Sequence, residues 1–304
     1  MMVTNKRKKA QAVFKVSIPV ILCASLWLIP FFAWAEETQD PTLSLARGLA
    51  LEGDHAGAAV EFRRQGLEAG ESVGRGGYFW ASAYEYQQAD RHEVSDRMLD
   101  RAEDAEPGLG VKALLLRAEN TAAQKRWKEE AYYRQSILDG QAPEDMKRYT
   151  ALRLAEARLR LGEIDEAREA LQAAPGWNSV SMEAIDEYVA GHDKSPKTGG
   201  LLGMIPGMGY MYAGEYGNGF RSIILNSLFI FGMVSTAQDD QWGAFAVITF
   251  FEFTWYSGSI YGGVDASHRY NRDRLESCID HVRGDASFEP DYEVLPSISL
   301  KFKF

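Results

Sequence analysis

Residues 151–175, ALRLAEARLRLGEIDEAREALQAAP, decide the fold of this chain. Apolar residues recur at helical spacing on both sides of Gly162, which predicts two helices joined by a short turn. Ala155 and Ala167 are small where the two helices approach each other, and Leu171 is large on the far side. The proline that closes the stretch stops the second helix. The stretch therefore predicts one helical hairpin with a close helix–helix contact.

Related patterns precede this hairpin at intervals of about 34 residues, the period of a helical-hairpin repeat. Each such hairpin buries its apolar face only by stacking on a neighbour, so about three or more are needed for stability. The corresponding residues are Ala46, Leu49, Gly53, Asp54, Ala58 and Phe62 in the first unit, Phe79, Ala83, Tyr86, Leu99, Ala102 and Pro107 in the second, and Leu114, Ala118, Trp127, Ala131 and Tyr133 in a degenerate third.

Residues 41–175 thus resemble the tetratricopeptide-repeat superfamily, with four units and without the full Trp, Leu-Gly and Tyr signature in any of them. The resemblance implies a right-handed solenoid whose concave groove binds a peptide or a partner helix. A generic helical bundle is the alternative. Aromatic residues that would line the groove, unless they belong to the core, are Tyr78, Trp80, Tyr84, Tyr132 and Tyr133.

The N-terminus has the pattern of a secretory signal peptide, expected over residues 1–35. Five basic residues precede an apolar core at 16–32, and Ala33-Trp34-Ala35 provides the small-x-small motif that signal peptidase accepts. An uncleaved anchor is the alternative. The pattern predicts export to the bacterial cell envelope, with a repeat domain over 38–192 in the periplasm.

The charge of the chain is acidic, with a formal net charge of −10 that becomes −15 without the five basic residues of the signal peptide. Nucleic acids and anionic lipids both need clustered Lys and Arg, so we expect no nucleic-acid partner, and the acidic chain is also a poor candidate for binding anionic lipid. Cys23 lies in the signal peptide, which leaves Cys278 without an internal disulfide partner.

The segment 193–270 is predicted to be a membrane domain. Its Gly- and Pro-rich opening, residues 199–214, suits an interfacial or re-entrant element. Two apolar runs follow, at 219–236 and 242–262, each long enough to cross a hydrocarbon core of about 30 Å. The short loop between them requires antiparallel neighbours. A soluble buried hairpin is the alternative.

The opening of this segment carries the motif Pro-Gly-x-Gly-x-x-Tyr-x-Gly. It resembles the start of small bacterial two-helix membrane domains, over about residues 199–263. The resemblance implies a closely packed transmembrane hairpin and assigns no activity. Tyr210 stands where the family usually has Gln. The matching residues are Pro206, Gly207, Gly209, Tyr212 and Gly214.

Polar residues inside the apolar runs are few. Asn226 and Glu252 lie 13 residues on either side of Asp239 in the loop, so we expect them at equal depth and in contact. They are interpreted as internal contacts between the helices. The alternative is an ion or proton path to which Arg221 also contributes.

The topology and the tail leave further alternatives open. Basic residues flank the hairpin while the loop carries Asp239 and Asp240, which disagrees with a periplasmic repeat domain on an inner-membrane hairpin. The choice between inner and outer membrane therefore stays open.

Residues 271–304 are polar and end in a β-like strand, in which Ile298, Leu300, Phe302 and Phe304 alternate with polar residues. This strand either pairs with a partner's sheet, packs locally or is disordered.

No arrangement of residues predicts catalysis. The five histidines are scattered without metal-ligand spacing, and no phosphate-binding loop or nucleophile elbow occurs. We therefore expect an all-α, non-enzymatic envelope adaptor or scaffold without a cofactor. Its expected partners are envelope proteins and membrane lipid, with homo- or hetero-oligomers forming through the hairpin. The alternative function is a subunit of a transport or secretion assembly.

Overall fold

The computed structural model describes residues 41–304, except residues 73 and 175–178. The predicted signal peptide and Pro175 lie outside the described residues. Within the described part, thirteen α-helices account for most of the chain, which confirms the all-α prediction. Two short 3₁₀ segments, Pro107–Leu109 and Tyr292–Val294, and two strands complete the secondary structure.

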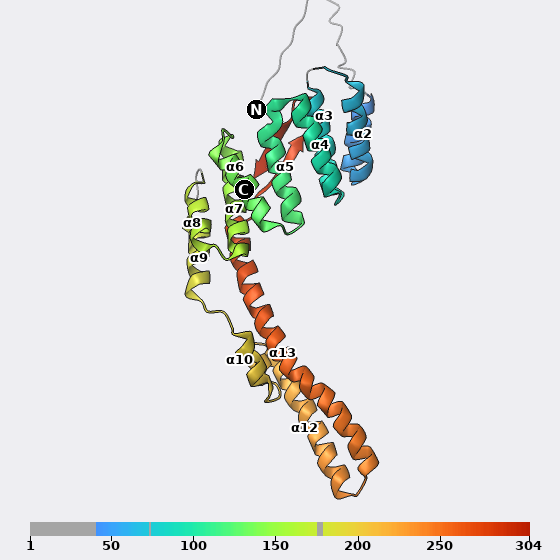
Figure 1. The fold of residues 1–304 in the computed structure, drawn as a ribbon, viewed down its shortest axis with the longest axis vertical. Coiled ribbons are helices and arrows are strands. Elements are labelled where there is room, and N and C mark those ends of the chain that lie inside the picture. The colour runs from blue at the N-terminus through green and yellow to red at the C-terminus, as the bar shows by residue number, and fades with distance from the viewer. Residues whose placement is uncertain (1–40, 73, 175–178) are drawn as a thin grey trace, which may run out of the picture. The chain divides into compact units, whose positions relative to one another are not determined.

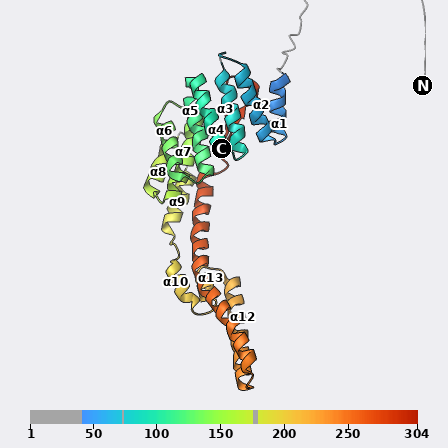
Figure 2. The same cartoon turned by 45° about the vertical axis from the view of Figure 1, so that its right-hand side comes forward.

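The first eight helices follow one another in space as in sequence, and Figures 1 and 2 show α2 to α8 in chain order in both views. Consecutive helices from α2 onward pack against each other. Their bounds are α1 Pro41–Leu51, α2 His55–Glu68, α3 Arg75–Gln88, α4 His92–Ala105, α5 Gly110–Ala123, α6 Trp127–Asp139, α7 Glu144–Leu161 and α8 Ile164–Gln172.

The turns between these helices form where the sequence predicted them. Gly162 ends α7 with φ +78°, a left-handed conformation that glycine adopts without steric cost. Asp54 caps α2 by accepting a hydrogen bond from the Gly57 amide at 2.9 Å. The small residues Ala155 and Ala167 are fully buried between α7 and α8, as the spacing of the apolar residues required.

Five further helices follow. They are α9 Ser179–Ala190, α10 Pro196–Gly203, α11 Met208–Tyr212, α12 Tyr216–Gln238 and α13 Trp242–Arg283. Helix α12 packs against the first part of α13 after a tight turn at Asp239, as Figure 1 shows. Helices α10 and α11 also pack against α13.

Helix α13 is one unbroken helix of 42 residues, where the sequence predicted a span ending at 262 and then a polar tail. Its C-terminal part packs against α7 and α9. Ile279 and Val282 are buried there beside Leu154, Leu171 and Ile185 of the preceding helices. The helix therefore continues through residue 270, where the sequence predicted a boundary, because apolar residues at helical spacing continue to residue 282.

The tail folds back on the chain. Strand β1 Ser287–Asp291 pairs antiparallel with β2 Ser299–Lys303. The alternation predicted for β2 is present, with Ile298 buried and Leu300 and Phe302 half-buried, while Lys301 and Lys303 are exposed. Of the three alternatives for the tail, local packing is the one observed.

Candidate functional site

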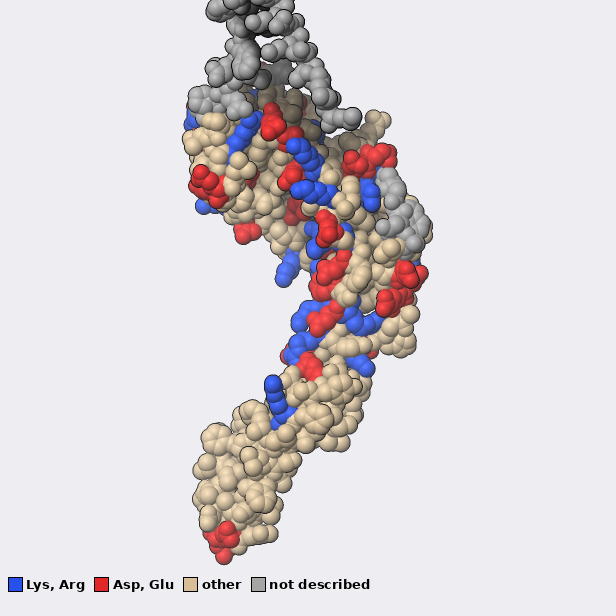
Figure 3. Space-filling view, turned by 180° about the vertical axis from the view of Figure 1, so that it is seen from behind, with Lys and Arg blue, Asp and Glu red and all other residues tan. Residues whose placement is uncertain are grey.

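The apolar helix pair, defined as α12 and residues 242–262 of α13, exposes large apolar side chains over most of its surface. Phe231 and Phe253 are 72% and 71% exposed. A surface of this extent marks contact with a membrane or another apolar surface. Figure 3 shows this end of the molecule almost without charge except at its tip. Other exposed side chains are Phe220, Ile224, Leu228, Ile230, Val234, Trp242, Val247, Phe250, Phe251, Trp255 and Tyr261.

One helix of the described residues, α12, is long and apolar enough to cross a membrane by length and composition. The sequence had predicted two such spans. The first part of α13 is less apolar because Glu252 interrupts it and hydroxyl residues such as Thr249 and Thr254 follow its aromatic residues closely. Its outward side chains are nevertheless as exposed as those of α12.

The predicted contact between Asn226 and Glu252 is not a hydrogen bond. Both side chains are buried at the interface of α12 and α13, but the Asn226 amide donates at 2.6 Å to the carbonyl of Ser222 in its own helix. Asn226 Oδ1 and Glu252 Oε2 are buried without a hydrogen-bond partner. The Asn226 amide nitrogen is bonded within its own helix instead, so equal depth alone did not join the two side chains. Two orphaned acceptors lie inside the apolar helix pair.

Arg221 also lies apart from these two residues. Its side chain is exposed, and no carboxylate within the described part of the chain pairs with it. It lines a hollow of about 290 Å³ between α11, α12 and α13. The three residues predicted to share one polar contact therefore occupy two separate places.

Gly209 lies where three helices, α10, α11 and α13, come into close contact. A Cβ on Gly209 would lie 2.5 Å from the Gly199 carbonyl oxygen and 2.8 Å from Gly263 Cα. Gly207, directly before α11, approaches α12 in the same way, since a Cβ there would lie 2.3 Å from the Gly219 carbonyl oxygen. Only glycine permits these approaches, so packing requires Gly207 and Gly209.

The other motif residues complete the same junction. Tyr212 accepts a hydrogen bond from the Ser195 amide at 3.0 Å, and the Lys194 ammonium lies 5.0 Å from its ring. Gly214 turns the chain into α12 with φ +88°. Pro206 lines a cavity of about 340 Å³ beside Glu252. The motif thus sets the geometry at one end of the apolar helix pair.

The chain's own tail packs on helices that carry aromatic residues predicted for a partner groove. Aromatic residues of β1 and β2 contact aromatic residues of α3 and α7: the Phe288 ring lies 6.1 Å from Tyr84 and 5.4 Å from Tyr149, and Phe302 lies 5.6 Å from Tyr149. Burial raises the pKa of Tyr84 to about 12. The face of the first helices of each pair is therefore covered.

The segment between the two strands is also held by polar contacts. Lys112 of α5 donates at 2.6 Å to the Ile298 carbonyl, and Tyr292 donates to Glu85 of α3. Arg47 of α1 donates to the Tyr292 carbonyl. Residues from α1, α3, α5 and α7 thus all contact the tail, a set of contacts across more than 100 residues that no local pattern predicted.

The aromatic residues predicted for the groove divide into three groups. Trp80 is fully buried in the core beneath Tyr84, so of the two alternatives for this residue the core is the one observed. Tyr78 and Tyr84 are half-buried in the core cluster that carries the tail. Tyr132 and Tyr133 lie on α6 with ring centroids 5.7 Å apart, and Tyr132 is 69% exposed.

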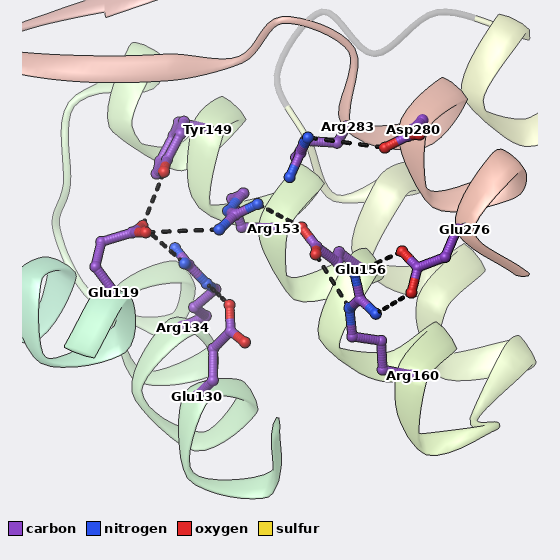
Figure 4. A network of polar contacts seen from close by, with 10 residues as sticks. All are labelled: Glu119, Glu130, Arg134, Tyr149, Arg153, Glu156, Arg160, Glu276, Asp280 and Arg283. Carbon is purple, nitrogen blue, oxygen red and sulfur yellow. Dashed lines mark hydrogen bonds and ion pairs between the residues drawn. The ribbon is translucent and has the colours of Figure 1, made fainter. Parts of the chain in front are cut away.

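A buried polar network crosses the middle of the repeats, as Figure 4 shows. Arg134 is fully buried and donates to Glu130 at 2.7 Å and to Glu119 at 2.8 Å, while Tyr149 also donates to Glu119. Burial opposes the charge of Glu119, but Arg134 and Arg153 outweigh it and lower the pKa of Glu119. Burial raises the pKa of Glu130, although Arg134 acts against it.

The network reaches α13 through a second cluster. Arg160 donates to both oxygens of Glu276 at 2.8 and 3.0 Å and also to Glu156 at 3.2 Å. The hydrogen bond from Arg160 lowers the pKa of Glu276. Glu130 and Glu156 are both buried, although they are charged. Each is followed four residues later by the arginine that it binds, a spacing at which two side chains meet on one helix face.

Two negative findings concern metal binding and similarity to known proteins. Within the described ranges, no group of three or more His, Cys, Asp or Glu side chains is placed to hold a metal ion. No family model, curated protein or solved structure matches the chain. The site is therefore defined by the chain's own contacts: an apolar helix pair, a glycine junction, and a repeat face that carries the tail.

Proposed function

We propose that the chain is a non-enzymatic scaffold of the bacterial cell envelope, attached to a membrane by the apolar helix pair. The observation that carries the proposal is helix α13, which is lined by exposed aromatic residues at its start and buried in the repeat core at its end. The apolar helix pair and the repeat domain thus share one continuous helix, α13. We infer that α1 to α8 form a tetratricopeptide-like solenoid, supported by the small residues between the helices of each pair.

Membrane attachment is tested by vesicle flotation of the full chain. Phe231→Asp and Phe253→Asp change side chains that are more than 70% exposed, so neither alters internal packing. A carboxylate in hydrocarbon costs about 2.5–3.5 kcal/mol or more, so each variant should float less than the parent chain. Tyr132→Asp, at 69% exposure on α6, is the matched control and should float normally. Flotation of all three variants alike would contradict attachment through the helix pair.

Export is tested with a new cysteine on the repeats. Tyr132→Cys in a Cys278→Ala background places an exposed thiol on α6. A membrane-impermeant maleimide should label it once the outer membrane is permeabilised, if the repeats are periplasmic. Labelling that appears only after the inner membrane is broken would place the repeats in the cytoplasm.

The partner surface that we propose is the part of the repeats left open by the tail, where the exposed Tyr132 ring packs edge-on against the half-buried Tyr133. Aromatic residues are enriched in protein interfaces. A photo-crosslinking residue at position 132 should yield a protein adduct of defined mass in cells, and one at Lys128 should yield it less efficiently. The same adduct from positions 132 and 84 would indicate that the partner also displaces the tail.

A second candidate function is a subunit of a transport assembly, favoured by the two orphaned oxygens of Asn226 and Glu252. A buried carboxyl next to a cavity of about 340 Å³ is the kind of group that passes protons. Reconstituted vesicles with a pH-sensitive dye would test this function. Proton flux that Glu252→Gln abolishes, with flotation unchanged, would favour transport. Equal background flux in vesicles with the parent chain and with the Glu252→Gln variant would favour the scaffold.

A further inference from the structure

The exposed charged side chains of the apolar helix pair and its loop, Arg221, Asp239 and Asp240, lie at two levels, while Glu252 is buried between them. The charged residues of 198–264 are Glu215, Arg221, Asp239, Asp240 and Glu252. Arg221 and Asp239 are 18 residues apart in sequence, about 27 Å along a helix that rises about 1.5 Å per residue. This spacing is close to the hydrocarbon thickness of about 30 Å. If Asp239 and Asp240 mark one surface of a bilayer, Arg221 lies at the headgroup level of the other.

Arg221 is set in a hollow rather than on a flat surface. The hollow of about 290 Å³ is lined by Tyr210 of α11, by Asn218 and Ser222 of α12, and by Thr254 and Trp255 of α13. Its lining is therefore mixed, with hydroxyl and amide groups beside aromatic rings. Tyr and Trp side chains are typical of the membrane–water interface, where one part of the ring system is apolar and the other wet.

The charge inside the hollow is not neutralised by the protein. Glu215 is the nearest acidic residue in sequence, but its carboxylate binds Arg269 at 2.8 Å and accepts from Asn218 at 2.7 Å. Two other arginines near this end are paired, since Arg269 binds Glu215 and Arg274 binds Asp193 at 2.6 Å. Arg221 makes no ion pair or hydrogen bond with the described part of the chain, so its five donors are available.

We propose that this hollow binds the phosphate of an anionic phospholipid headgroup, with Arg221 as the charged donor. A guanidinium presents a planar pair of donors that matches two phosphate oxygens. The exposed ring of Trp255, which lines the hollow, contacts the first part of the acyl chains. The inference rests on the proposed membrane attachment and adds a lipid class to it. It departs from the sequence expectation against anionic lipid, because one unpaired arginine in a hollow binds a single headgroup without a cluster of basic residues.

The test reconstitutes the full chain in nanodiscs of phosphatidylcholine containing a minor fraction of phosphatidylglycerol. After mild detergent extraction, native mass spectrometry counts the lipids retained. The parent chain should retain phosphatidylglycerol preferentially, and Arg221→Gln should lower that retention about tenfold, the order of a lost charge-assisted hydrogen bond. Arg221→Lys keeps the charge without the paired donors and should give an intermediate value.

Arg272→Gln is the matched control, because Arg272 is also exposed on α13 and lies beyond the apolar helix pair. It should retain phosphatidylglycerol like the parent chain. Equal retention by the Arg221→Gln chain would overturn the proposal, and so would equal retention of both lipids by the parent chain. An excess of inorganic phosphate should not release the lipid; release would assign the hollow to free phosphate instead.

Failure of membrane attachment and failure of the headgroup site give different results. If the parent chain does not float with phosphatidylcholine vesicles, the proposed membrane scaffold is wrong. If it floats but shows no preference that depends on Arg221, the scaffold stands and the headgroup site is wrong.

Discussion

Gly77 of α3 lies directly against the carbonyl of Pro296, so that a Cβ placed on Gly77 would lie 1.7 Å from the Pro296 oxygen. The contact is between backbone atoms, and neither side yields by rotating a side chain. It shows how closely the segment between β1 and β2 approaches the helix that carries Tyr78 and Tyr84. The repeat face and the tail therefore constrain each other directly.

Gly77→Ala should loosen the tail. Alanine usually favours a helix over glycine by about 1 kcal/mol, but here the clash should reverse the sign and cost about 1–3 kcal/mol. Limited proteolysis should then release residues 284–304 faster, and the midpoint of urea unfolding should fall. Gly48→Ala in α1, where nothing lies within 4 Å, should be neutral or slightly stabilising. Identical behaviour of the two variants would show that the tail does not depend on this approach.

Arg134→Met should destabilise the repeat domain by about 3–5 kcal/mol, because Glu119 and Glu130 then lose the buried cation that both bind. Chemical unfolding followed by circular dichroism measures the difference. Arg126→Met is the control, since Arg126 and Glu129 are both about half exposed and such a pair is worth about 0–1 kcal/mol. Comparable losses in the two variants would contradict a special role for the buried network.

The same variant should change how stability depends on pH. In the parent chain the pKa of Glu119 is lowered, so its contribution is present above the ordinary glutamate pKa of about 4.3 and is lost as the pH falls through the lowered value. Without Arg134, burial should raise the pKa of both carboxyls. The folded variant then takes up protons, so its deficit should shrink as the pH is lowered from about 8 to about 5. A deficit that stays constant with pH would indicate lost packing alone.

Ile279→Ala should weaken the attachment of α13 to the repeats by about 2–5 kcal/mol, because Ile279 is fully buried beside α7 and α9. Glu276→Gln, three residues earlier, should cost about 0–1 kcal/mol, since the Glu276 side chain is 42% exposed. Hydrogen exchange of α13 amides measures both. Greater loss from Glu276→Gln would mean that ion pairs rather than apolar packing hold the helix.

Cys278 should react slowly with thiol reagents in the folded chain. It is 5% exposed, and burial raises the pKa of its thiol to about 11. At about pH 8 the thiolate fraction is then on the order of 0.1%, and labelling should rise about tenfold per pH unit. Tyr132→Cys in a Cys278→Ala background should label at the rate of a free thiol. Rapid labelling of native Cys278 would show that α9 and α13 separate at this position.

The sequence predicted those parts of the fold that depend on local spacing. Ala155, Gly162 and Ala167 lie where the helical period placed them, and the glycine motif lies where three helices meet. Both are encoded within a few turns of chain. A period and a small residue specify a close contact without information about distant segments.

The errors have a common physical cause, which is contact between segments far apart in sequence. For Trp80 both a groove and a core position were open, because nothing local reveals that Tyr84 stacks on it. Asn226 and Glu252 were expected in contact because their equal depth was known, but the direction of their side chains was not. The continuity of α13 was missed because the composition becomes polar near residue 265, while Cys278, Ile279 and Val282 resume the apolar period afterwards.

The length of α13 has a mechanical consequence. A helix of 42 residues extends about 63 Å at about 1.5 Å per residue. It contains no proline to act as a joint. A tilt of about 10° at one end, if the helix stays straight, displaces the other by about 11 Å over that length. If the apolar helix pair lies in a membrane, as we propose, a change in bilayer thickness or in the packing of α12 would therefore displace the polar network at Glu276.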